Sequence, residues 1–331
     1  MMAKIRFSSG EIIESDGDTI LNTALRAGLG FPYECNSGSC GVCKFVLENG
    51  DVESLYPDAP AISRRDLKKN RKLACQCKPK SDLNISVNLN SEYCPGPIPV
   101  TFNTVLQRIE EIVGGIFSVR LEIPDDLEFL AGQYGLITLP RVGRRAYSMA
   151  NYPGDGSNYI EFFIKRVPGG TLSEQLTDSK NIGLKVRFDG PFGFAHIERS
   201  KRDIICLAGG SGLAPMVSIA RFFNKKDDGR NMKFLFGART SDDLLTKTEF
   251  FDLIGKKNQR IEYLRCVSHQ KHISSTDEAG YLHEVLMENY ESSLLNFDIF
   301  CAGPPPMVDA VASYLSGIGF PLNQLFFDRF Y

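Results

Sequence analysis

The segment that decides the fold of the N-terminal part is Phe31-Pro-Tyr-Glu-Cys-Asn-Ser-Gly-Ser-Cys-Gly-Val-Cys43, in which three cysteines are spaced C-x4-C-x2-C. Two more cysteines follow in Leu73-Ala-Cys-Gln-Cys-Lys-Pro79, and the chain has nine in all. An odd number, with five gathered between positions 35 and 77, does not fit a disulfide framework. Clustered thiols of this kind are typical of metal or cluster ligation in a reducing compartment.

The spacing favours a plant-type [2Fe–2S] cluster. Three thiolates from one loop would surround the cluster, while Gly38 and Gly41 would allow strained backbone conformations that bring amide N–H groups to the sulfurs. A zinc site is the alternative, but structural zinc prefers paired C-x2-C units and the sequence has only one. Either thiol of Cys75-Gln-Cys77 could be the fourth ligand; we choose Cys75 and interpret Cys77 as a free thiol. The predicted metal ligands are Cys35, Cys40, Cys43 and Cys75.

Length and composition indicate a chain that folds throughout. At roughly 150 residues per domain, 331 residues make two or three domains. A hydrophobic content of 43% and a charged content of 24% are ordinary for globular proteins, and the net charge of -2 gives no general attraction to nucleic acid or membranes. The N-terminus has no signal-peptide or transit-peptide pattern, and the charge-free run 204–220 is too short and glycine-rich to span a membrane. We therefore expect a cytoplasmic protein.

Residues 1–92 are predicted to form a small α+β domain. Residues 18–28 have the pattern of one short helix, with Asp18 as its N-cap and Gly28 at its end. Residues 83–90 alternate between apolar and polar side chains, which predicts a strand with one buried face. Three prolines and a glycine in residues 93–99 break regular structure, so we place a proline-rich linker there.

The rest of the chain is predicted to form two further domains. Residues 100–200 contain short β-branched and aromatic runs separated by Gly, Pro and Asp, which is the pattern of an antiparallel barrel. Residues 201–331 alternate strands with helices, which predicts a parallel α/β domain. The expected strands are 100–109, 116–123, 134–139, 159–167, 184–188, 204–208, 233–237, 261–267 and 298–302, and the expected helices begin near 214, 242, 282 and 305.

Two segments of the predicted barrel suit a flavin. Arg145-Ala-Tyr-Ser148 would present a cation, an aromatic face and a hydroxyl to the phosphate and ring of such a cofactor. Gly169-Gly-Thr-Leu-Ser173 is a glycine turn that opens a helix, where free backbone N–H groups would favour a pyrophosphate; a plain hairpin turn is the alternative. The predicted flavin-binding residues are Arg145, Tyr147, Ser148, Gly169, Gly170, Thr171 and Ser173.

The α/β domain begins with a glycine-rich loop, Leu207-Ala-Gly-Gly-Ser-Gly-Leu-Ala-Pro215. The loop follows a predicted strand and opens a helix, so its glycines would let a dinucleotide diphosphate approach the helix N-terminus. A hydrolase nucleophile at Ser211 is excluded, because the motif G-x-S-x-G would need glycine where Leu213 stands. The predicted nucleotide-binding residues in this loop are Gly209, Gly210, Ser211, Gly212 and Pro215.

Taken in this order, the cysteine segments and the flavin and nucleotide motifs resemble the reductase components of multicomponent aromatic-ring oxygenases, of the toluene monooxygenase and carbazole dioxygenase reductase type. The resemblance covers essentially the whole chain. It implies a β-grasp ferredoxin domain, an FAD-binding antiparallel β-barrel of the ferredoxin-NADP reductase superfamily, and an NAD-binding α/β domain with a parallel sheet. It also implies that Cys35 and Cys40 hold one iron, and Cys43 and Cys75 the other.

The same resemblance assigns roles around the flavin. Tyr147 would pack on the isoalloxazine ring and Ser148 would face its N5 atom, which makes these two the predicted catalytic positions. Arg145 would bind the pyrophosphate. The aromatic end of the chain would lie near the ring, with Tyr331 or Phe330 covering it, although a simple last strand with a packed aromatic end is an equal alternative.

On the nicotinamide side, the segment 301–307 would approach the coenzyme through Gly303 and Pro304. Many members of the family have a cysteine immediately before that glycine, whereas this chain has Ala302 there. Cys301 stands one place earlier, on the opposite face of the strand, so it is given no catalytic role.

The coenzyme is predicted to be NADH. The ribose 2′ position would lie near Arg239, at the end of the second strand of the α/β domain. The positive charge of Arg239 would attract a 2′-phosphate, but the negative charges of Asp242 and Asp243 would repel it. Family members with similar Gly-Ala-Arg segments use NADH.

Basic residues gather around the fourth predicted cluster ligand, with Asp66 as the one acid among them: Arg64, Arg65, Lys68, Lys69, Arg71, Lys72, Lys78 and Lys80. One hypothesis is a docking surface for an acidic electron acceptor. The alternatives are a solvated helix face and a surface that docks on the chain's own flavin domain.

The resemblance implies an electron-transfer reductase. Hydride would pass from NADH to FAD, and single electrons would pass through the [2Fe–2S] cluster to a Rieske-type ferredoxin or a terminal oxygenase that acts on an aromatic or other hydrocarbon. We expect no nucleic-acid or membrane partner and a monomeric chain. The alternatives are a stand-alone NADH reductase for another acceptor, such as a cytochrome P450, and a non-catalytic redox sensor.

Overall fold

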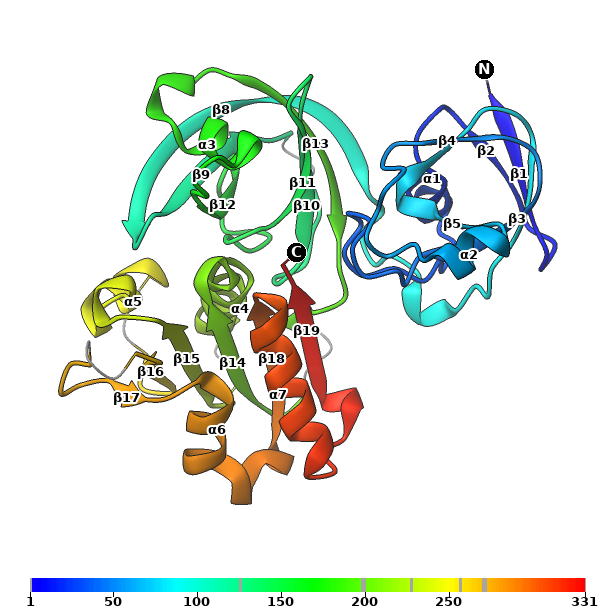
Figure 1. The fold of residues 1–331 in the computed structure, drawn as a ribbon. Coiled ribbons are helices and arrows are strands. Elements are labelled where there is room, and N and C mark those ends of the chain that lie inside the picture. Colours follow the sequence, from blue (N-terminus) through cyan, green and yellow to red (C-terminus); the bar gives the residue numbers. More distant parts are fainter. Residues whose placement is uncertain are drawn as a thin grey trace. The chain divides into compact units, whose positions relative to one another are not determined.

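The computed structural model describes residues 2–124, 127–197, 201–226, 229–255, 258–269 and 273–330. The chain divides into two compact units (Figure 1). Unit 1 consists of Met1–Thr101 with Asp189–Phe192, and unit 2 consists of Phe102–Phe188 with Gly193–Tyr331. No helix in the described ranges is long and apolar enough to cross a membrane.

Unit 1 is built on a mixed five-stranded sheet of order β2-β1-β7-β3-β5, in which β1 and β7 are parallel and the other neighbours antiparallel. A second, two-stranded sheet pairs β4 with β6. The strands are β1 (Ala3–Phe7), β2 (Ile12–Ser15), β3 (Lys44–Asn49), β4 (Val52–Ser54), β5 (Arg71–Leu73), β6 (Cys77–Pro79) and β7 (Leu83–Ser86), and the helices are α1 (Ile20–Arg26) and α2 (Arg64–Lys68). This arrangement confirms the small α+β domain.

The start of α1 differs from the prediction by one residue. Thr19, not Asp18, is the N-cap, because its hydroxyl accepts the amide N–H of Asn22 at 3.3 Å. Asp18 instead accepts the amide N–H of Thr19 at 2.7 Å. Both residue types cap helices well, so the sequence pattern could not choose between these neighbours.

The first half of unit 2 is an antiparallel sheet of order β11-β10-β13-β8-β9-β12. A bridge between Met149 and Phe162 brings the edge strands β11 and β12 together, so the sheet curls into the predicted barrel (Figure 1). Apolar side chains such as Val119, Ile137 and Phe188 fill its interior. The elements are β8 (Val100–Val113), β9 (Ile116–Glu122), β10 (Tyr134–Leu139), β11 (Gly143–Ser148), β12 (Tyr159–Lys165), α3 (Thr171–Thr177) and β13 (Lys185–Phe192).

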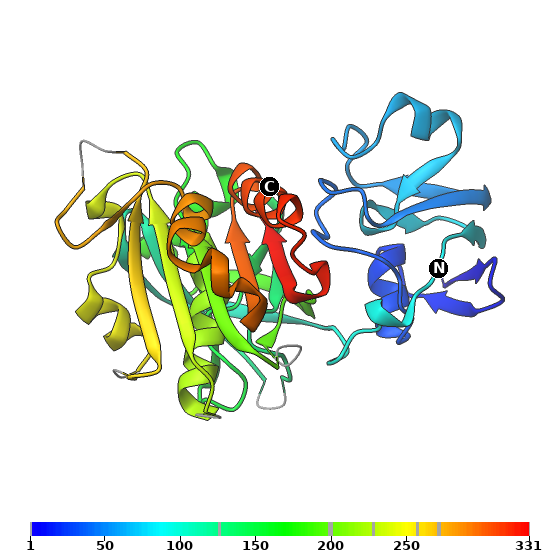
Figure 2. The same cartoon turned by 90° about the horizontal axis from the view of Figure 1, so that it is seen from below.

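The second half of unit 2 is a parallel sheet of order β17-β16-β15-β14-β18-β19. Helices α4 and α5 cover one face, and α6 and α7 cover the other (Figure 2). The strands are β14 (Asp203–Gly209), β15 (Met232–Ala238), β16 (Ile261–Val267), β17 (Glu278–Ala279), β18 (Phe297–Gly303) and β19 (Leu325–Arg329), and the helices are α4 (Leu213–Lys226), α5 (Lys247–Leu253), α6 (Leu282–Tyr290) and α7 (Pro305–Gly317).

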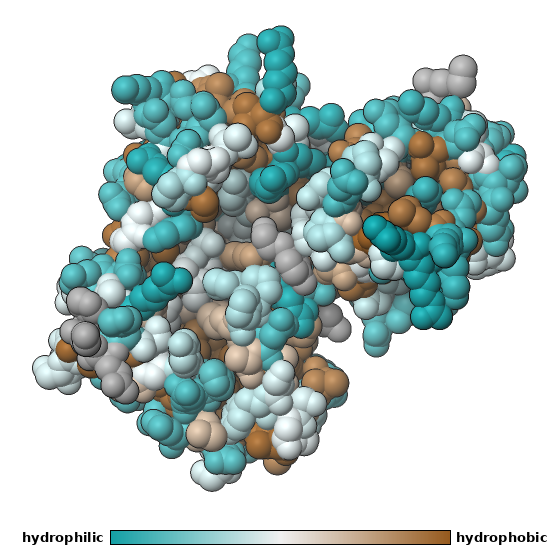
Figure 3. Space-filling model, in the orientation of Figure 1, coloured by the Kyte–Doolittle hydropathy of each residue, from teal (hydrophilic) through white to brown (hydrophobic). Residues whose placement is uncertain are grey.

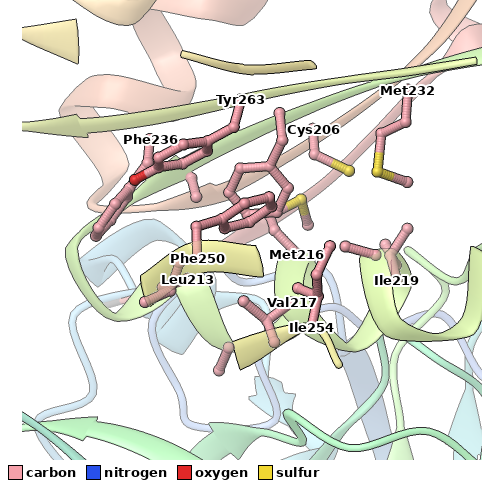
Figure 4. Close-up of a cluster of buried hydrophobic side chains, with 14 of the residues drawn as sticks. Cys206, Leu213, Met216, Val217, Ile219, Met232, Phe236, Phe250, Ile254 and Tyr263 are labelled. Atoms are coloured by element: carbon pink, nitrogen blue, oxygen red, sulfur yellow. The ribbon is translucent and has the colours of Figure 1, made fainter. Parts of the chain in front are cut away.

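Both faces of this sheet are buried, as expected for a parallel sheet between helices. Along β14, Cys206 packs towards α4 and α5, while Leu207 packs towards α6 and α7. Figure 4 shows the first of these clusters, in which the rings of Phe250 and Tyr263 stack at 4.1 Å between centroids. The glycine-rich loop connects the carboxyl end of β14 to α4. Because both elements pack in this core, the core fixes the position of the loop.

Candidate functional site

Four cysteine thiols of unit 1 form two pairs. The sulfurs of Cys43 and Cys75 lie 3.4 Å apart, although the two residues come from different segments. Cys35 and Cys40 form the second pair, and the Cys35 sulfur also accepts the amide N–H groups of Ser37 and Cys40, each at 3.4 Å. Hydrogen bonds from Cys40 and Ser37 outweigh burial and lower the pKa of Cys35 to about 4, which favours the thiolate form that binds metals.

The loop that carries these thiols has left-handed backbone at three positions. Gly38 has a φ of 89° and Gly41 a φ of 80°, and Asn36 has a φ of 49°. Side chains with a Cβ rarely adopt such angles, and a Cβ on Gly38 would lie 3.2 Å from the side chain of Gln76. Glycine at these positions lets the loop curl tightly around the space between the thiols.

The paired arrangement matches the ligand pattern of a [2Fe–2S] cluster, which takes two thiolates on each iron. A zinc site would instead need its ligands to converge on one ion. Cys77 is also buried, and burial raises its pKa to about 11.

Strand β11 carries the predicted flavin residues Arg145, Tyr147 and Ser148. In its pairing with β10, Arg145 lies opposite Ile137 and Tyr147 lies opposite Gly135, so Arg145 and Tyr147 share one face of the strand. Burial raises the pKa of the Tyr147 phenol to about 12, so the ring stays neutral. Arg145 is exposed, whereas Ser148 is buried on the other face.

The glycine turn before α3 differs from the prediction of free backbone N–H groups. The Gly169 N–H donates to the carboxylate of Glu174 at 2.8 Å, and the Gly170 N–H donates to the Val167 carbonyl at 2.8 Å. Ser173 accepts the Val167 N–H at 3.3 Å and so closes the turn. Thr171 begins α3 directly after the turn. A pyrophosphate that binds the Gly169 N–H must therefore displace the Glu174 carboxylate.

The glycine-rich loop lies where the order of the parallel sheet reverses. The chain leaves β14 for β15 on one side and later returns to β18 on the other, and nucleotides bind in such crevices at the carboxyl ends of strands. A Cβ on Gly212 would lie 1.9 Å from the Ala302 carbonyl oxygen, and one on Gly209 would lie 2.3 Å from the Met307 sulfur. Gly303, with a φ of 154°, approaches the Gly209 carbonyl from β18.

These contacts bring several predicted nucleotide residues together at one crevice. They are Gly209, Gly210, Ser211 and Gly212 with Pro215 in the first turn of α4, and Gly303 and Pro304 after β18. The Phe330 N–H donates to the Gly303 carbonyl at 3.0 Å, so the aromatic end of the chain reaches the same crevice. Tyr331 lies outside the described residues.

Helix α4 joins the nucleotide loop to the flavin strand through buried hydrogen bonds. The Ser218 hydroxyl donates to the Asn151 carbonyl at 2.6 Å and accepts the Gly132 N–H at 3.3 Å. Arg221 donates to the Ala150 carbonyl at 3.0 Å and pairs with the buried Glu161 carboxylate at 2.6 Å. Asn151 lies three positions after Ser148, so α4 is held against the end of β11.

Three families of protein domains match the chain in the predicted order. They are the 2Fe-2S iron-sulfur cluster binding domain over residues 7–80, the oxidoreductase FAD-binding domain over 105–197 and the oxidoreductase NAD-binding domain over 206–313.

Relatives align over almost the full length. The ferredoxin–NAD(P)(+) reductase CarAd of Metapseudomonas resinovorans is 37% identical over 95% of each chain. The ferredoxin–NAD(+) reductase component of the alkene monooxygenase system of Xanthobacter autotrophicus is 34% identical over 98% of this chain and 100% of its own. The solved ferredoxin reductase in carbazole 1,9a-dioxygenase superposes with a TM-score of 0.91 and 34% identity, covering 100% of this chain and 99% of its own.

The chain belongs to the reductase components of multicomponent oxygenases. Membership confirms the resemblance, the three-part fold and the cofactors: this reductase has a 2Fe–2S domain, an FAD-binding domain and an NAD-binding domain, and it is an electron-transferring oxidoreductase. The solved Amycolatopsis cytochrome P450 reductase GcoB also shares the fold, with a TM-score of 0.84 and 25% identity, covering 99% of this chain and 98% of its own.

In the segment predicted to lie near the coenzyme ribose, Asp242 and Asp243 have different surroundings. Arg239 is exposed beyond the carboxyl end of β15, and Asp242 is exposed too. Asp243 is half-buried and accepts a hydrogen bond from the Thr240 hydroxyl at 2.8 Å. Its carboxylate also lies close to Gly114 of the barrel, so Asp242 is the freer of the two acids to face a bound ribose.

Cys301 is buried in the core of the α/β domain. The thiol packs with Leu207 and Val311 on the face of the sheet that α6 and α7 cover, away from the barrel. Burial raises its pKa to about 12, so it is a protonated core side chain.

The motifs missed four residues with a possible role at the site: Glu174, Ser218, Glu161 and Arg221. Glu174 left no sequence signal, whereas Ser218 and Arg221 are polar residues on a helix that is otherwise apolar between Leu213 and Phe223. Glu161 is a charged residue inside the apolar run of β12. A polar residue in an apolar run indicates a contact with another element, but the sequence does not predict which element that is.

Proposed function

We propose that this reductase takes electron pairs from NADH and delivers single electrons to a Rieske-type ferredoxin or a terminal oxygenase. The observation that carries the proposal is the pairing of four thiols, with Cys43 and Cys75 3.4 Å apart, in a chain that also has flavin and nucleotide domains. Hydride exchange alone does not need an iron–sulfur centre. A centre that carries one electron at a time suits the delivery of single electrons to an acceptor.

The chain's own residues would hold the cofactors in this order. Cys35, Cys40, Cys43 and Cys75 would be the cluster ligands. When bound, FAD accepts two electrons as hydride and releases them singly, and a [2Fe–2S] cluster carries one electron at a time. Tyr147 would lie against the flavin ring with Ser148 at its N5 atom, and the flavin phosphates would be held by Arg145, Gly169, Gly170, Thr171 and Ser173.

The nucleotide would bind through backbone groups of the loop after β14. Gly209, Gly210, Ser211 and Gly212 leave room for a diphosphate, and the N-terminus of α4 favours its negative charge. Gly303 and Pro304 would flank the nicotinamide, and Arg239 would meet the ribose. We infer NADH rather than NADPH, because the exposed Asp242 carboxylate would repel a 2′-phosphate.

We infer the acceptor from the names of the relatives and from the proposed transfer of single electrons through the cluster. Relatives are named for carbazole, alkene and xylene/toluene oxygenase systems, which supports an oxygenase that acts on a hydrocarbon. A cytochrome P450 is the second candidate, supported by the likeness to GcoB. A monomeric chain and a cytoplasmic location also remain predictions.

Paired substitutions test the cluster ligands. Cys75→Ser should abolish the visible iron–sulfur absorption and lower bound iron, because it removes one thiolate. Cys77→Ser, one residue beyond Gln76, should retain both iron and absorption and serves as the matched control. Equal loss in both variants, or loss in Cys77→Ser alone, contradicts the assignment of Cys75.

An acceptor panel tests the function. NADH-dependent reduction of a Rieske ferredoxin should require the cluster, so Cys75→Ser should lose it while direct reduction of ferricyanide by the flavin persists. Rieske ferredoxin reduction by Cys75→Ser at the native rate would contradict the relay.

A further inference from the structure

The helix α2 and the strand β5 carry a dense group of basic side chains. Six of the nine residues from Arg64 to Lys72 are Arg or Lys, and Asp66 is the one acid. We call this group the α2 basic surface; it consists of Arg64, Arg65, Lys68, Lys69, Arg71 and Lys72. Its charge is concentrated in one short segment of a chain whose overall net charge is only -2.

Asp66 neutralises only a small part of this charge. Its carboxylate is buried, accepts the Ser63 hydroxyl at 2.6 Å, and pairs with Lys44 at 3.0 Å and with Arg71 at 3.4 Å. It therefore caps α2 and ties it to β3 and β5. The exposed residues Arg64, Arg65, Lys68 and Lys69 form no ion pair within the described part of the chain.

The α2 basic surface is connected to the predicted cluster ligands from two sides. Lys44, the partner of Asp66, lies beside the cluster loop: its Nζ would be 3.5 Å from a Cβ on Gly41. Strand β5 begins with Arg71 and Lys72 and ends at Leu73, two residues before Cys75. Basic side chains therefore lie next to both the cluster loop and the segment that carries Cys75.

Apolar side chains are exposed in the same part of unit 1. Val42, next to Cys43, is 37% exposed, Tyr56 is 45% exposed and Leu67 of α2 is 53% exposed. The Tyr56 ring lies against Gly38 of the cluster loop. Figure 3 shows hydrophobic patches beside strongly hydrophilic side chains on this face. Protein recognition surfaces commonly combine an apolar centre with a charged rim.

We propose that the α2 basic surface, with Val42 and Tyr56, is the docking site for an electron-acceptor protein that carries carboxylates around its redox centre. The inference rests on the proposed one-electron function and adds the chemistry of the partner. One electron leaves the reduced cluster and one acceptor centre gains it, with no bond made or broken. Opposite charges would raise the rate of encounter and orient the acceptor towards the cluster loop.

The test is binding of a defined acidic acceptor to the oxidised holoenzyme. The probe is cytochrome b5, an acidic haem protein, and cytochrome c is its basic counterpart. In the variant, Arg64, Arg65 and Lys68 are changed to Glu, which removes positive charge without touching the cysteines or Asp66. In the control, Lys180, Lys225 and Lys247 of unit 2, all exposed, are changed to Glu, so the total charge changes by the same amount.

We expect the first variant to bind cytochrome b5 at least about ten-fold more weakly at low ionic strength, and the control to differ less than two-fold. The difference should disappear at about 0.5 M salt, where screening is strong. The first variant should also bind cytochrome c more tightly than the native chain does. Equal weakening in both variants, or no weakening in the first, would overturn the proposal.

Two further outcomes would also overturn it. Tighter binding of a DNA duplex than of cytochrome b5, with the same dependence on the three residues, would indicate a general polyanion site. Slower NADH-driven reduction of the cluster in the first variant, without acceptor present, would indicate docking on the chain's own flavin domain. Failure of the proposed function is seen separately, because then NADH does not reduce the cluster of the native holoenzyme.

Discussion

At the scale of single residues, Gly212 fixes the closest approach of two chain segments. Its α-carbon faces the Ala302 carbonyl, and any Cβ would overlap that oxygen at 1.9 Å. The sequence indicated that glycines in this loop make room for a phosphate. The structure adds that Gly212 also makes room for β18, a contact between residues far apart in the chain.

Gly212→Ala should therefore damage both the fold and the coenzyme site. We expect destabilisation of about 1–3 kcal/mol, because the loop and β18 must separate, and a higher KM for NADH. Thermal unfolding and steady-state kinetics measure the two effects. Gly317→Ala is the matched control, because its new Cβ meets nothing within 4 Å. A Gly212→Ala variant as stable as this control would contradict the close contact.

Glu161 and Arg221 form a second residue-scale feature with a predictable pH dependence. Burial raises the pKa of Glu161, but the charge of Arg221 and hydrogen bonds from Ser118 and Arg221 outweigh it, so the net pKa lies below 4.5. A lowered folded-state pKa stabilises the fold above the unfolded value and loses that effect as the pH falls through the folded value.

Arg221→Met should weaken this balance. Without the Arg221 charge, only Arg120 at 3.0 Å and the Ser118 hydroxyl oppose the burial of Glu161, so its pKa should rise from the native value and the variant should lose about 3 kcal/mol at pH 7. The loss should shrink as the pH falls towards about 4, because Glu161 then binds a proton. Urea unfolding at both pH values measures it. If adding Glu161→Gln does not restore stability at pH 7, the pair is not the cause.

At the scale of elements, the sequence predicted best where apolar periodicity was strong. The strands 134–139 and 261–267 begin and end as predicted. Strand β11 was missed because Gly-Arg-Arg-Ala-Tyr-Ser has no apolar alternation, and its conformation depends on pairing with β10. Helix α5 starts at Lys247, not near 242, because Thr246 and Glu249 form a capping box that the apolar pattern did not reveal.

The attachment of α4 to the barrel gives an element-scale prediction. Ser218→Ala removes the hydrogen bond to the Asn151 carbonyl and leaves the Gly132 N–H without its acceptor, at a cost of about 1–3 kcal/mol. Because α4 positions the nucleotide loop relative to β11, we expect a several-fold lower rate of flavin reduction by NADH and little change in FAD binding.

Stopped-flow absorbance measures that rate, and flavin fluorescence measures FAD binding. Ser313→Ala, an exposed position on α7, is the control and should match the native chain. Loss of FAD with an unchanged reduction rate would show that Ser218 supports the barrel and does not position the loop.

At the scale of the whole molecule, the order of the three domains could be predicted because each carries its own local motif. The position of the Cys75 thiol next to Cys43, in contrast, could not be predicted from local sequence patterns. Its separation of 3.4 Å from Cys43 depends on the antiparallel pairing of β3 with β5, which no spacing along the chain encodes. The links of Ser218 and Arg221 to Asn151 and Glu161 likewise join residues that only the folded chain brings together.

The central claim is that electrons pass from NADH through FAD to a [2Fe–2S] cluster in one chain. The most direct test is the absorption and electron paramagnetic resonance of anaerobic holoenzyme before and after stoichiometric NADH, with iron and released flavin measured. We predict about two irons and one FAD per chain, rapid bleaching of the flavin and iron–sulfur bands, and the resonance of a reduced [2Fe–2S] cluster. Zinc in place of iron, or a spectrum that NADH leaves unchanged, would contradict the account.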